Sequence, residues 1–395
     1  MTQEDRALDT LLAERGVSRR DFLKFCGSVA AMLGLSELMV PQIAAAVEAA
    51  AASKLTPAIW LDGGLCTGCT ESTAQSTDPD VATIVLDILS LNYMETLAYA
   101  TGSSAEEALK QTVEQNKGKF IMVYEGSVMT GFDGNALRIA GKTGLDQIKE
   151  VAPFAAAIIA VGSCAVDGGW VKSYPNPAGA TGIGMYLKSQ GIATPVINLP
   201  TCPVNPRWLV AMVIDVILLG ELASGAILGK LDEFGRPKLI YGQTIHDNCP
   251  RRGHFENGEF VYQFGSAEEA KGYCLYAMGC KGPQTYTNCP IVRWNDKVSW
   301  CVEAGSPCIG CGDFNWVDEN APFLSRSRRI GIGHVGNQQG GWNPATVAAL
   351  AGAAVAGVLV VHGVGMKAAG RIGDGPPTEE MKDYDRKRIK KGGDK

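Results

Sequence analysis

The cysteines constrain this chain more than any other feature of its sequence. It has 395 residues and 12 cysteines, of which Cys26 lies in an N-terminal segment distinct from the body of the chain. Eleven cysteines therefore remain in the body, and an odd number rules out complete disulfide pairing. The cysteine content is also too low for a small disulfide scaffold. We therefore expect these thiols to bind something other than one another.

The remaining cysteines fall into three groups along the sequence, and a histidine completes the second group. The first group is Cys66, Cys69, Cys164 and Cys202, the second is His246, Cys249, Cys274 and Cys280, and the third is Cys289, Cys301, Cys308 and Cys311. Each group offers four ligands, and no cysteine of the body is left over. Sets of four thiolate or imidazole ligands are typical of metal and cluster sites.

The ligand types leave more than one chemistry open. Four thiolates, or three thiolates and an imidazole, suit a 4Fe–4S cluster. The same ligands suit structural zinc, and a lone C-x-x-C pair also occurs in redox dithiols. Unrelated buried thiols are a poor explanation for eleven cysteines in three even groups. The spacing favours iron–sulfur clusters over zinc, and zinc over disulfides.

Apolar runs and helical patterns alternate between residues 53 and 241. Short buried strands are predicted at Ala58–Leu61, Lys119–Tyr124, Ala156–Val161 and Pro195–Leu199. Helices are predicted at Ser103–Lys117, Gly144–Val151, Thr181–Gln190 and Trp208–Gly220. The apolar segment Val81–Ser90 fits either a strand or a helix. Strands that alternate with helices predict a flavodoxin-like α/β domain with a doubly wound parallel sheet.

Three of the predicted strands are followed directly by cysteines of the first group. Cys66 and Cys69 follow the first strand, and Cys164 and Cys202 each follow one of the last two. In a parallel sheet the loops after the strands meet at the carboxyl edge, where ligands bind. We therefore expect these four thiolates to surround one cluster.

Residues 242–330 differ in character from the segment before them. They are rich in Cys, Gly, Pro, Asn and aromatic residues and show little periodicity. Burial alone stabilises such a segment poorly, and bound metal commonly supplies the missing stability. We predict an irregular domain that holds the second and third groups. The net charge of -5 argues against a nucleic acid as a partner, because phosphates attract a basic surface.

Residues 1–52 resemble a twin-arginine export signal. The string Ser18-Arg19-Arg20-Asp21-Phe22-Leu23-Lys24 precedes a moderately apolar stretch and an Ala-rich run. The alternative is an amphipathic helix that happens to carry an arginine pair. An export signal would place the body of the chain in the periplasm, or otherwise outside the cytoplasmic membrane.

A second apolar stretch, residues 343–366, contains no Asp, Glu, Lys or Arg. Its length is enough to cross a bilayer as one helix, and a buried helix is the alternative. A linker, residues 331–342, precedes it, and a charged tail, residues 367–395, follows it. The basic residues of the tail place it in the cytoplasm, which agrees with an exported body and a single-pass anchor in the cell membrane.

Seven short motifs give the chain a resemblance to a known family. They occupy residues 66–72, 162–164, 200–203, 246–252, 274–276, 279–283 and 308–311. In order and content they resemble the small subunit of membrane-bound, periplasm-facing uptake nickel–iron hydrogenases. The resemblance runs from about Ala58 to Trp316 and extends to both terminal segments.

The resemblance implies a cluster for each group. The first group would hold a proximal 4Fe–4S cluster and the second a distal 4Fe–4S cluster. Cys289, Cys308 and Cys311 would hold a medial cluster. Most relatives have a proline at the position of Cys301, beside the open corner of a medial 3Fe–4S cluster. A fourth thiolate there predicts a medial 4Fe–4S cluster instead, with 3Fe–4S as the alternative if Cys301 is not a ligand.

The resemblance also implies a function. In this family the nickel–iron centre that splits hydrogen lies on a separate large subunit, so this chain would contribute no catalytic residue. It would pass electrons to a membrane acceptor, such as a cytochrome b, another quinone-linked subunit or a ferredoxin-like partner. Gly68 and Gly169 stand where oxygen-tolerant relatives carry two extra cysteines, so that type of proximal cluster is not expected.

Two other functions compete with this one. A quinone-reductase subunit of the complex I type would resemble only the domain of the first group, and the Cys-rich second half argues against it. An exported, membrane-anchored structural zinc or iron–sulfur protein would share the ligands but need no redox partner. Iron and sulfide analysis separates the zinc protein from the others.

Overall fold

The computed structural model describes residues 56–77, 89–97, 100–218, 230–325 and 344–369, together with isolated positions elsewhere. Most of the predicted export signal, the predicted linker and nearly all of the predicted tail lie outside the described residues. The predictions for these segments therefore stay predictions.

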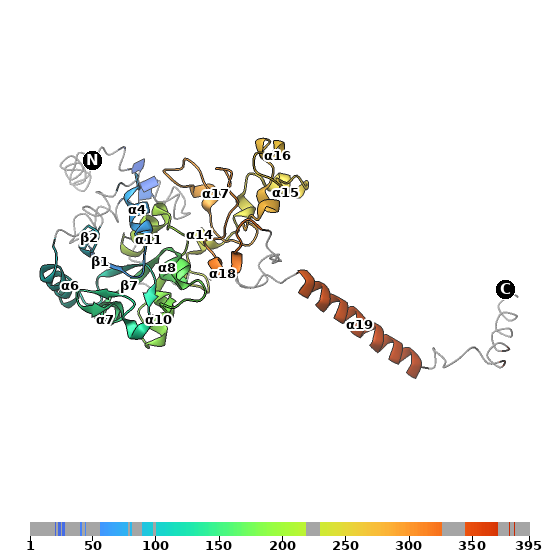
Figure 1. Ribbon diagram of the computed structural model, residues 1–395, viewed down its shortest axis with the longest axis horizontal. Helices are drawn as coiled ribbons and strands as arrows, with labels where there is room; N and C mark the ends of the chain where they lie inside the picture. Colours follow the sequence, from blue (N-terminus) through green and yellow to red (C-terminus); the bar gives the residue numbers. More distant parts are fainter. Residues whose placement is uncertain are drawn as a thin grey trace.

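A five-stranded sheet forms the centre of the first half of the chain (Figure 1). Its strands are β1 (Thr56–Asp62), β2 (Leu89–Met94), β3 (Ile121–Glu125), β7 (Ala157–Val161) and β9 (Val196–Leu199). Their spatial order is β2-β1-β3-β7-β9, and every neighbouring pair is parallel. Counted along the chain, this is the 2-1-3-4-5 order of a flavodoxin-like sheet. The prediction of a parallel α/β sheet is confirmed.

Four of the strands lie where the sequence predicted them, and β2 is the exception. Of the undecided segment, residues 81–88 lie outside the described residues, and its last two residues begin β2. The strand lies at the edge of the sheet, and its middle residues are partly exposed. It therefore lacks the continuous apolar run by which a buried parallel strand is recognised.

Both faces of the sheet are covered, and alternate residues of each strand belong to different cores. In β3, Ile121 and Val123 lie in one core, whereas Met122 and Tyr124 lie in the other. Helices α6 (Ser103–Gln115), α7 (Gly144–Val151), α8 (Gly162–Asp167) and α10 (Ile183–Ser189) contribute to the second core. Helices α4 (Gly68–Ala74) and α11 (Pro206–Leu218) lie on the opposite side (Figure 1).

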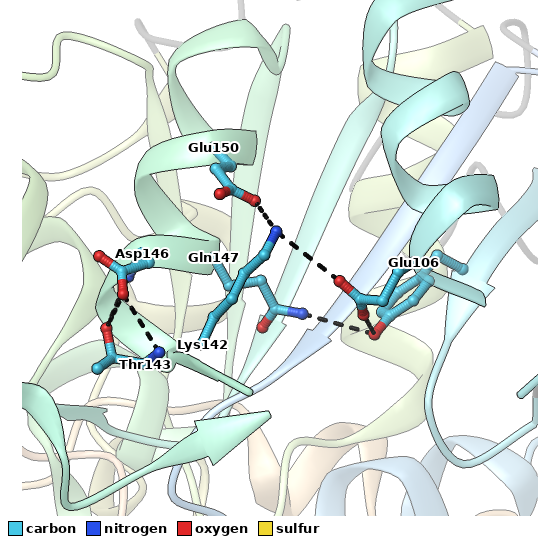
Figure 2. Close-up of polar contacts among 7 residues, drawn as sticks. Glu106, Lys142, Thr143, Asp146, Gln147 and Glu150 are labelled. Atoms are coloured by element: carbon cyan, nitrogen blue, oxygen red, sulfur yellow. Dashed lines mark hydrogen bonds and ion pairs between the residues drawn. The ribbon is translucent and has the colours of Figure 1, made fainter. Parts of the chain in front are cut away.

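Helix α7 begins with a capping box, which fixes its first turn. The Thr143 hydroxyl accepts from the Asp146 backbone N–H, and the Asp146 carboxylate accepts from the Thr143 backbone N–H. Figure 2 shows Lys142 beside this cap, between Glu150 of α7 at 2.6 Å and Glu106 of α6 at 3.9 Å. Such exposed ion pairs contribute at most about 1 kcal/mol each.

The helix boundaries differ from the prediction where a strand intervenes. Helix α10 begins at Ile183 rather than at Thr181, because Thr181 belongs to β8 (Ala180–Thr181), which pairs with β4 (Val128–Met129). The remaining short elements of this half are η3 (Phe132–Gly134), β5 (Arg138–Ile139), β6 (Lys142–Thr143), η4 (Ala152–Phe154) and α9 (Gly169–Lys172).

Residues 238–325 fold mostly as turns and irregular loops, with short helices and isolated bridges among them. The helices are α14 (Lys238–Tyr241), η5 (His246–Asn248), α15 (Arg252–Glu256), α16 (Ala267–Ala270), η6 (Leu275–Met278), α17 (Cys289–Val292) and α18 (Trp316–Asn320). Ile245, Val261 and Trp300 belong to the same apolar core as one face of the sheet. The irregular segment therefore packs directly on the sheet domain.

Helix α19 (Pro344–Ala368) follows the irregular segment and extends away from it (Figure 1). Within the described part of the chain, Leu350–Ala368 is long and apolar enough to cross a membrane, with a mean hydropathy of 1.6 and none of it buried. The prediction of a long apolar helix is confirmed, and the membrane crossing stays a prediction.

Candidate metal centres

The four cysteines of the first group meet at the carboxyl edge of the sheet. Cys66 lies in the loop between β1 and α4, and Cys69 lies in the first turn of α4. Cys164 lies in α8 after β7, and Cys202 follows β9. The backbone after β7 approaches the Cys69 sulfur so closely that a Cβ on Gly162 would lie 2.5 Å from it. Gly162 has a φ of +81°, which only glycine adopts readily. The predicted convergence of these loops agrees with this geometry.

The thiols of the first group also influence one another electrostatically. Burial, and to a smaller extent the neighbouring Cys164 and Cys66, raise the pKa of Cys202 to about 12. The pKa of Cys69 is raised well above its usual range by burial first, then by Glu125, with smaller effects of Cys202 and Cys164. Such thiols resist ionisation by themselves, and positive charge from bound iron would stabilise their thiolates.

Glu125, at the end of β3, supports the start of helix α4 from inside the protein. Its carboxylate accepts from the Cys69 backbone N–H at 3.0 Å, the Thr70 backbone N–H at 3.3 Å and the Thr70 hydroxyl at 2.6 Å. Sequence reasoning missed this residue, because no cysteine follows its strand. The available signal was an acidic residue that ends a buried apolar strand at the sheet edge where ligands bind.

The second group lines one small cavity in the irregular segment. His246, Cys249, Cys274 and Cys280 all border it, and Arg251 and Tyr276 lie beside them. Burial raises the pKa of Cys280 to about 11, with contributions from Cys274 and Cys249. Burial and Arg252 lower the pKa of His246, which favours the neutral imidazole that ligates metals. The His246 ring packs edge-on against Phe255, with ring centroids 4.5 Å apart.

The third group lines a larger cavity of about 280 Å³ between the sheet edge and the irregular segment. Its walls include Cys289, Cys301, Cys308 and Cys311, as well as Cys202 of the first group. The Thr287 hydroxyl donates to Cys289 Sγ at 3.0 Å, and the Gly310 backbone N–H donates to Cys308 Sγ at 3.4 Å. Donors of this kind stabilise thiolates.

Cys301 is the exposed member of the third group, but its sulfur interacts electrostatically with the other three thiols. It contributes to the raised pKa values of Cys289, Cys308 and Cys311, after burial and other neighbours. The structure therefore brings Cys301, which departs from the family pattern, into the same cavity as the three cysteines that match it.

The donor sets and their spaces fit iron–sulfur clusters. In the described part of the chain, no three His, Cys, Asp or Glu side chains are arranged closely enough to hold a single metal ion. The sulfurs instead surround cavities, and the third group has thiols as its only predicted ligands. For the third group, thiols around a space larger than one ion are the ligands that an iron–sulfur cluster needs.

Gly68 and Gly169 lie directly against sulfurs of the first group. A Cβ on Gly169 would lie 2.9 Å from Cys164 Sγ, and a Cβ on Gly68 would lie 3.1 Å from Cys66 Sγ. Gly169 also has a φ of +47°. A side chain at Gly169 would therefore need a local change of the backbone.

Two family models match the chain, one in each half. Residues 241–324 match the C-terminal domain of NiFe/NiFeSe hydrogenase small subunits. Residues 66–216 match the 20 kDa subunit of NADH ubiquinone oxidoreductase. The second match covers only the sheet domain, as expected for a complex I-type relative.

Full-length relatives match most of the chain. It is 42% identical over 315 residues to the periplasmic NiFe hydrogenase small subunit of Solidesulfovibrio fructosivorans, covering 80% of this chain and 95% of that protein. It is 40% identical to the quinone-reactive Ni/Fe-hydrogenase small chain of Wolinella succinogenes, covering 79% and 85%. Among solved structures, the NiFeSe hydrogenase of Desulfovibrio vulgaris Hildenborough is 35% identical with a TM-score of 0.65, covering 69% of this chain and 98% of that one.

Proposed function

This chain belongs to the family of nickel–iron hydrogenase small subunits, and we propose that it carries electrons through three iron–sulfur clusters from a large-subunit partner to a membrane acceptor. The observation that supports the proposal most directly is the gathering of the cysteines and His246 into three separate sites. A zinc protein or a complex I-type subunit is not favoured, because the relatives match across both halves of the chain.

Each site would bind one cluster through its own four residues. The first group would hold the proximal cluster, the second the distal cluster and the third the medial cluster, which we propose to be 4Fe–4S with Cys301 as its fourth ligand. When bound, the clusters supply one-electron carriers, which thiols alone do not provide. The protein binds them in place, and buried donors such as Thr287 stabilise the thiolates.

Membership of this family supports a proposal for the partners and the location. A small subunit of this family works with a large subunit that carries the nickel–iron centre. We propose a membrane cytochrome b or another quinone-linked subunit as acceptor, since one relative is named quinone-reactive. We further propose that helix α19 anchors the chain, with its body in the periplasm and its tail in the cytoplasm.

Purification of the complex from native membranes tests this proposal. We expect a second, larger subunit that contains nickel, and iron and sulfide in the small subunit in the ratio of three clusters. Visible absorption that bleaches under hydrogen would show that the clusters accept electrons. Zinc in place of iron, or a small subunit without a nickel-containing partner, would contradict the proposal.

Replacing His246 by cysteine is expected to lower the reduction potential of the distal cluster. A neutral imidazole is exchanged for an anionic thiolate, and added negative charge disfavours the reduced cluster. We expect a shift on the order of 100 mV, since histidine-for-cysteine exchange in Rieske centres changes potentials by several hundred millivolts. A redox titration followed by EPR measures it.

His254 provides the matched control for this experiment. It lies in the same segment, and its Nδ1 atom is hydrogen-bonded to Glu259 Oε2 at 2.6 Å. It does not line the cavity of the second group. His254→Cys is therefore expected to leave the distal potential unchanged. An equal shift in both variants, or none in His246→Cys, would show that His246 is not a ligand.

Truncation before residue 343 is expected to release the complex from the membrane. The change removes α19, whose described residues contribute nothing to the buried core. Hydrogen-dependent dye reduction is expected to persist, because all three proposed cluster sites lie upstream. Membrane fractions washed with high salt provide the measurement. A truncated complex that still sediments with washed membranes would show that another contact is the main anchor.

A further inference from the structure

Ser163 connects the first and third groups of cysteines. It directly precedes Cys164, and only 2% of its surface is exposed. Its backbone N–H donates to the Thr201 carbonyl at 2.8 Å, and its hydroxyl donates to the Cys311 carbonyl at 2.6 Å. One residue therefore joins the backbones that carry Cys164, Cys202 and Cys311.

The segments on either side of these bonds approach each other closely. Cys202 lines the cavity of the third group together with Cys311. The Cys202 thiol also contributes to the raised pKa of Cys311, after burial and other neighbours. Gly312, beside Cys311, leaves room for the approach, because a Cβ there would lie only 2.6 Å from Thr287 Cγ2 and 3.7 Å from Thr201 Cγ2. Proposed ligands of two different cluster sites thus line one cavity.

The shared cavity gives the two sites a common wall. The two hydrogen bonds of Ser163 join the backbones that carry Cys202 and Cys311 beside that wall. Ser163 is therefore placed to hold the two sites in position relative to each other.

We propose that Ser163 is a positioning residue that couples the proximal and medial cluster sites, because its hydroxyl holds the Cys311 backbone against the segment that carries Cys164. The inference rests on the proposed function, which assigns clusters to both sites. The step it supports is a one-electron transfer, in which the donor site is oxidised and the acceptor site reduced by the same electron. Ser163 itself exchanges neither an electron nor a proton.

The test is Ser163→Ala in the complete purified complex. The change leaves the Cys311 carbonyl without its donor, and we expect the loop to shift away from Cys202. In the fully reduced complex, the magnetic interaction between the two sites splits their EPR signals, and this splitting is expected to shrink or vanish. Iron and sulfide contents are expected to stay unchanged, which separates weaker coupling from loss of a cluster.

Thr194→Val is the matched control. It removes a hydroxyl-to-carbonyl hydrogen bond of 2.8 Å from Thr194, which precedes β9, to Ala152, which precedes β7, at the end of these parallel strands opposite the cysteines. Its EPR splitting is expected to equal that of the unaltered complex. Ser163→Thr keeps a hydroxyl, so it is expected to retain the splitting.

The outcomes separate this inference from the proposed function. An unaltered complex without iron–sulfur signals would overturn the proposed function, whatever Ser163 does. Normal clusters with unchanged splitting in Ser163→Ala would overturn the inference alone. If Ser163→Ala fails to bind clusters, Ser163→Thr decides. Normal clusters and splitting in that variant support the inference, and loss of clusters in both variants overturns it.

Discussion

Replacing Cys301 by proline is expected to remove one iron from the complex and to create a 3Fe–4S signal. The third group would then offer three thiolates, Cys289, Cys308 and Cys311, around a cavity of about 280 Å³. A site with three thiolates commonly holds a cluster that lacks one corner iron. An oxidised 3Fe–4S cluster is paramagnetic, whereas an ordinary oxidised 4Fe–4S cluster is silent, so EPR of the oxidised protein measures the change.

A second variant tests whether the sulfur or the backbone causes the change. Cys301→Ala removes the thiol without restricting the backbone, and we expect the same loss of one iron. The medial potential is expected to rise in both variants, because a thiolate is lost and the cluster type changes. A near-stoichiometric 3Fe–4S signal in the unaltered, anaerobically prepared protein would show instead that Cys301 is no ligand.

The sheet could be predicted from the sequence because its strands are buried on both faces. Residues such as Ile158 and Ile159 belong to opposite cores, so each strand appears as a continuous apolar run. The edge strand β2 has no such run. Thr181, which the sequence places in a helix, instead pairs with Val128 of another strand, and no local sequence pattern indicates this pairing. Prediction failed where a strand depends on a distant partner rather than on burial.

The grouping of the first four cysteines could be predicted by one topological rule. Loops after parallel strands meet at one edge, and Cys69, Cys164 and Cys202 lie there in the structure. The second and third groups had no such rule, because residues 242–325 form short helices and isolated bridges without periodicity. Their grouping relied on counting ligands and on the family resemblance.

The residues that support the ligands could not be predicted from spacing. The Ser163 hydroxyl donates to the backbone carbonyl of Cys311, 148 positions away. The Glu125 carboxylate accepts from the backbone N–H of Cys69, 56 positions away. A serine beside a cysteine and an acidic residue at the end of a strand are common in any sequence. Only the folded chain shows which partners they meet.

Glu125 is the supporting residue whose loss is expected to cost the most stability. It is 2% exposed and accepts three hydrogen bonds at the start of α4, which carries Cys69. Its removal would leave two backbone N–H groups and one hydroxyl without their acceptor inside the protein. Each buried donor without a partner costs about 1 to 3 kcal/mol.

Glu125→Ala is therefore expected to destabilise the protein by about 3 to 5 kcal/mol and to lower its midpoint of thermal unfolding by roughly 10 °C. Glu125→Gln is the matched control, because its amide oxygen can still accept from the Cys69 and Thr70 backbone N–H groups. We expect a smaller loss of stability and a higher proximal potential, since a negative charge beside the cluster is removed. Differential scanning calorimetry and a redox titration measure both effects. Equal midpoints for Glu125→Ala and the unaltered protein would show that these hydrogen bonds do not stabilise the Cys69 loop.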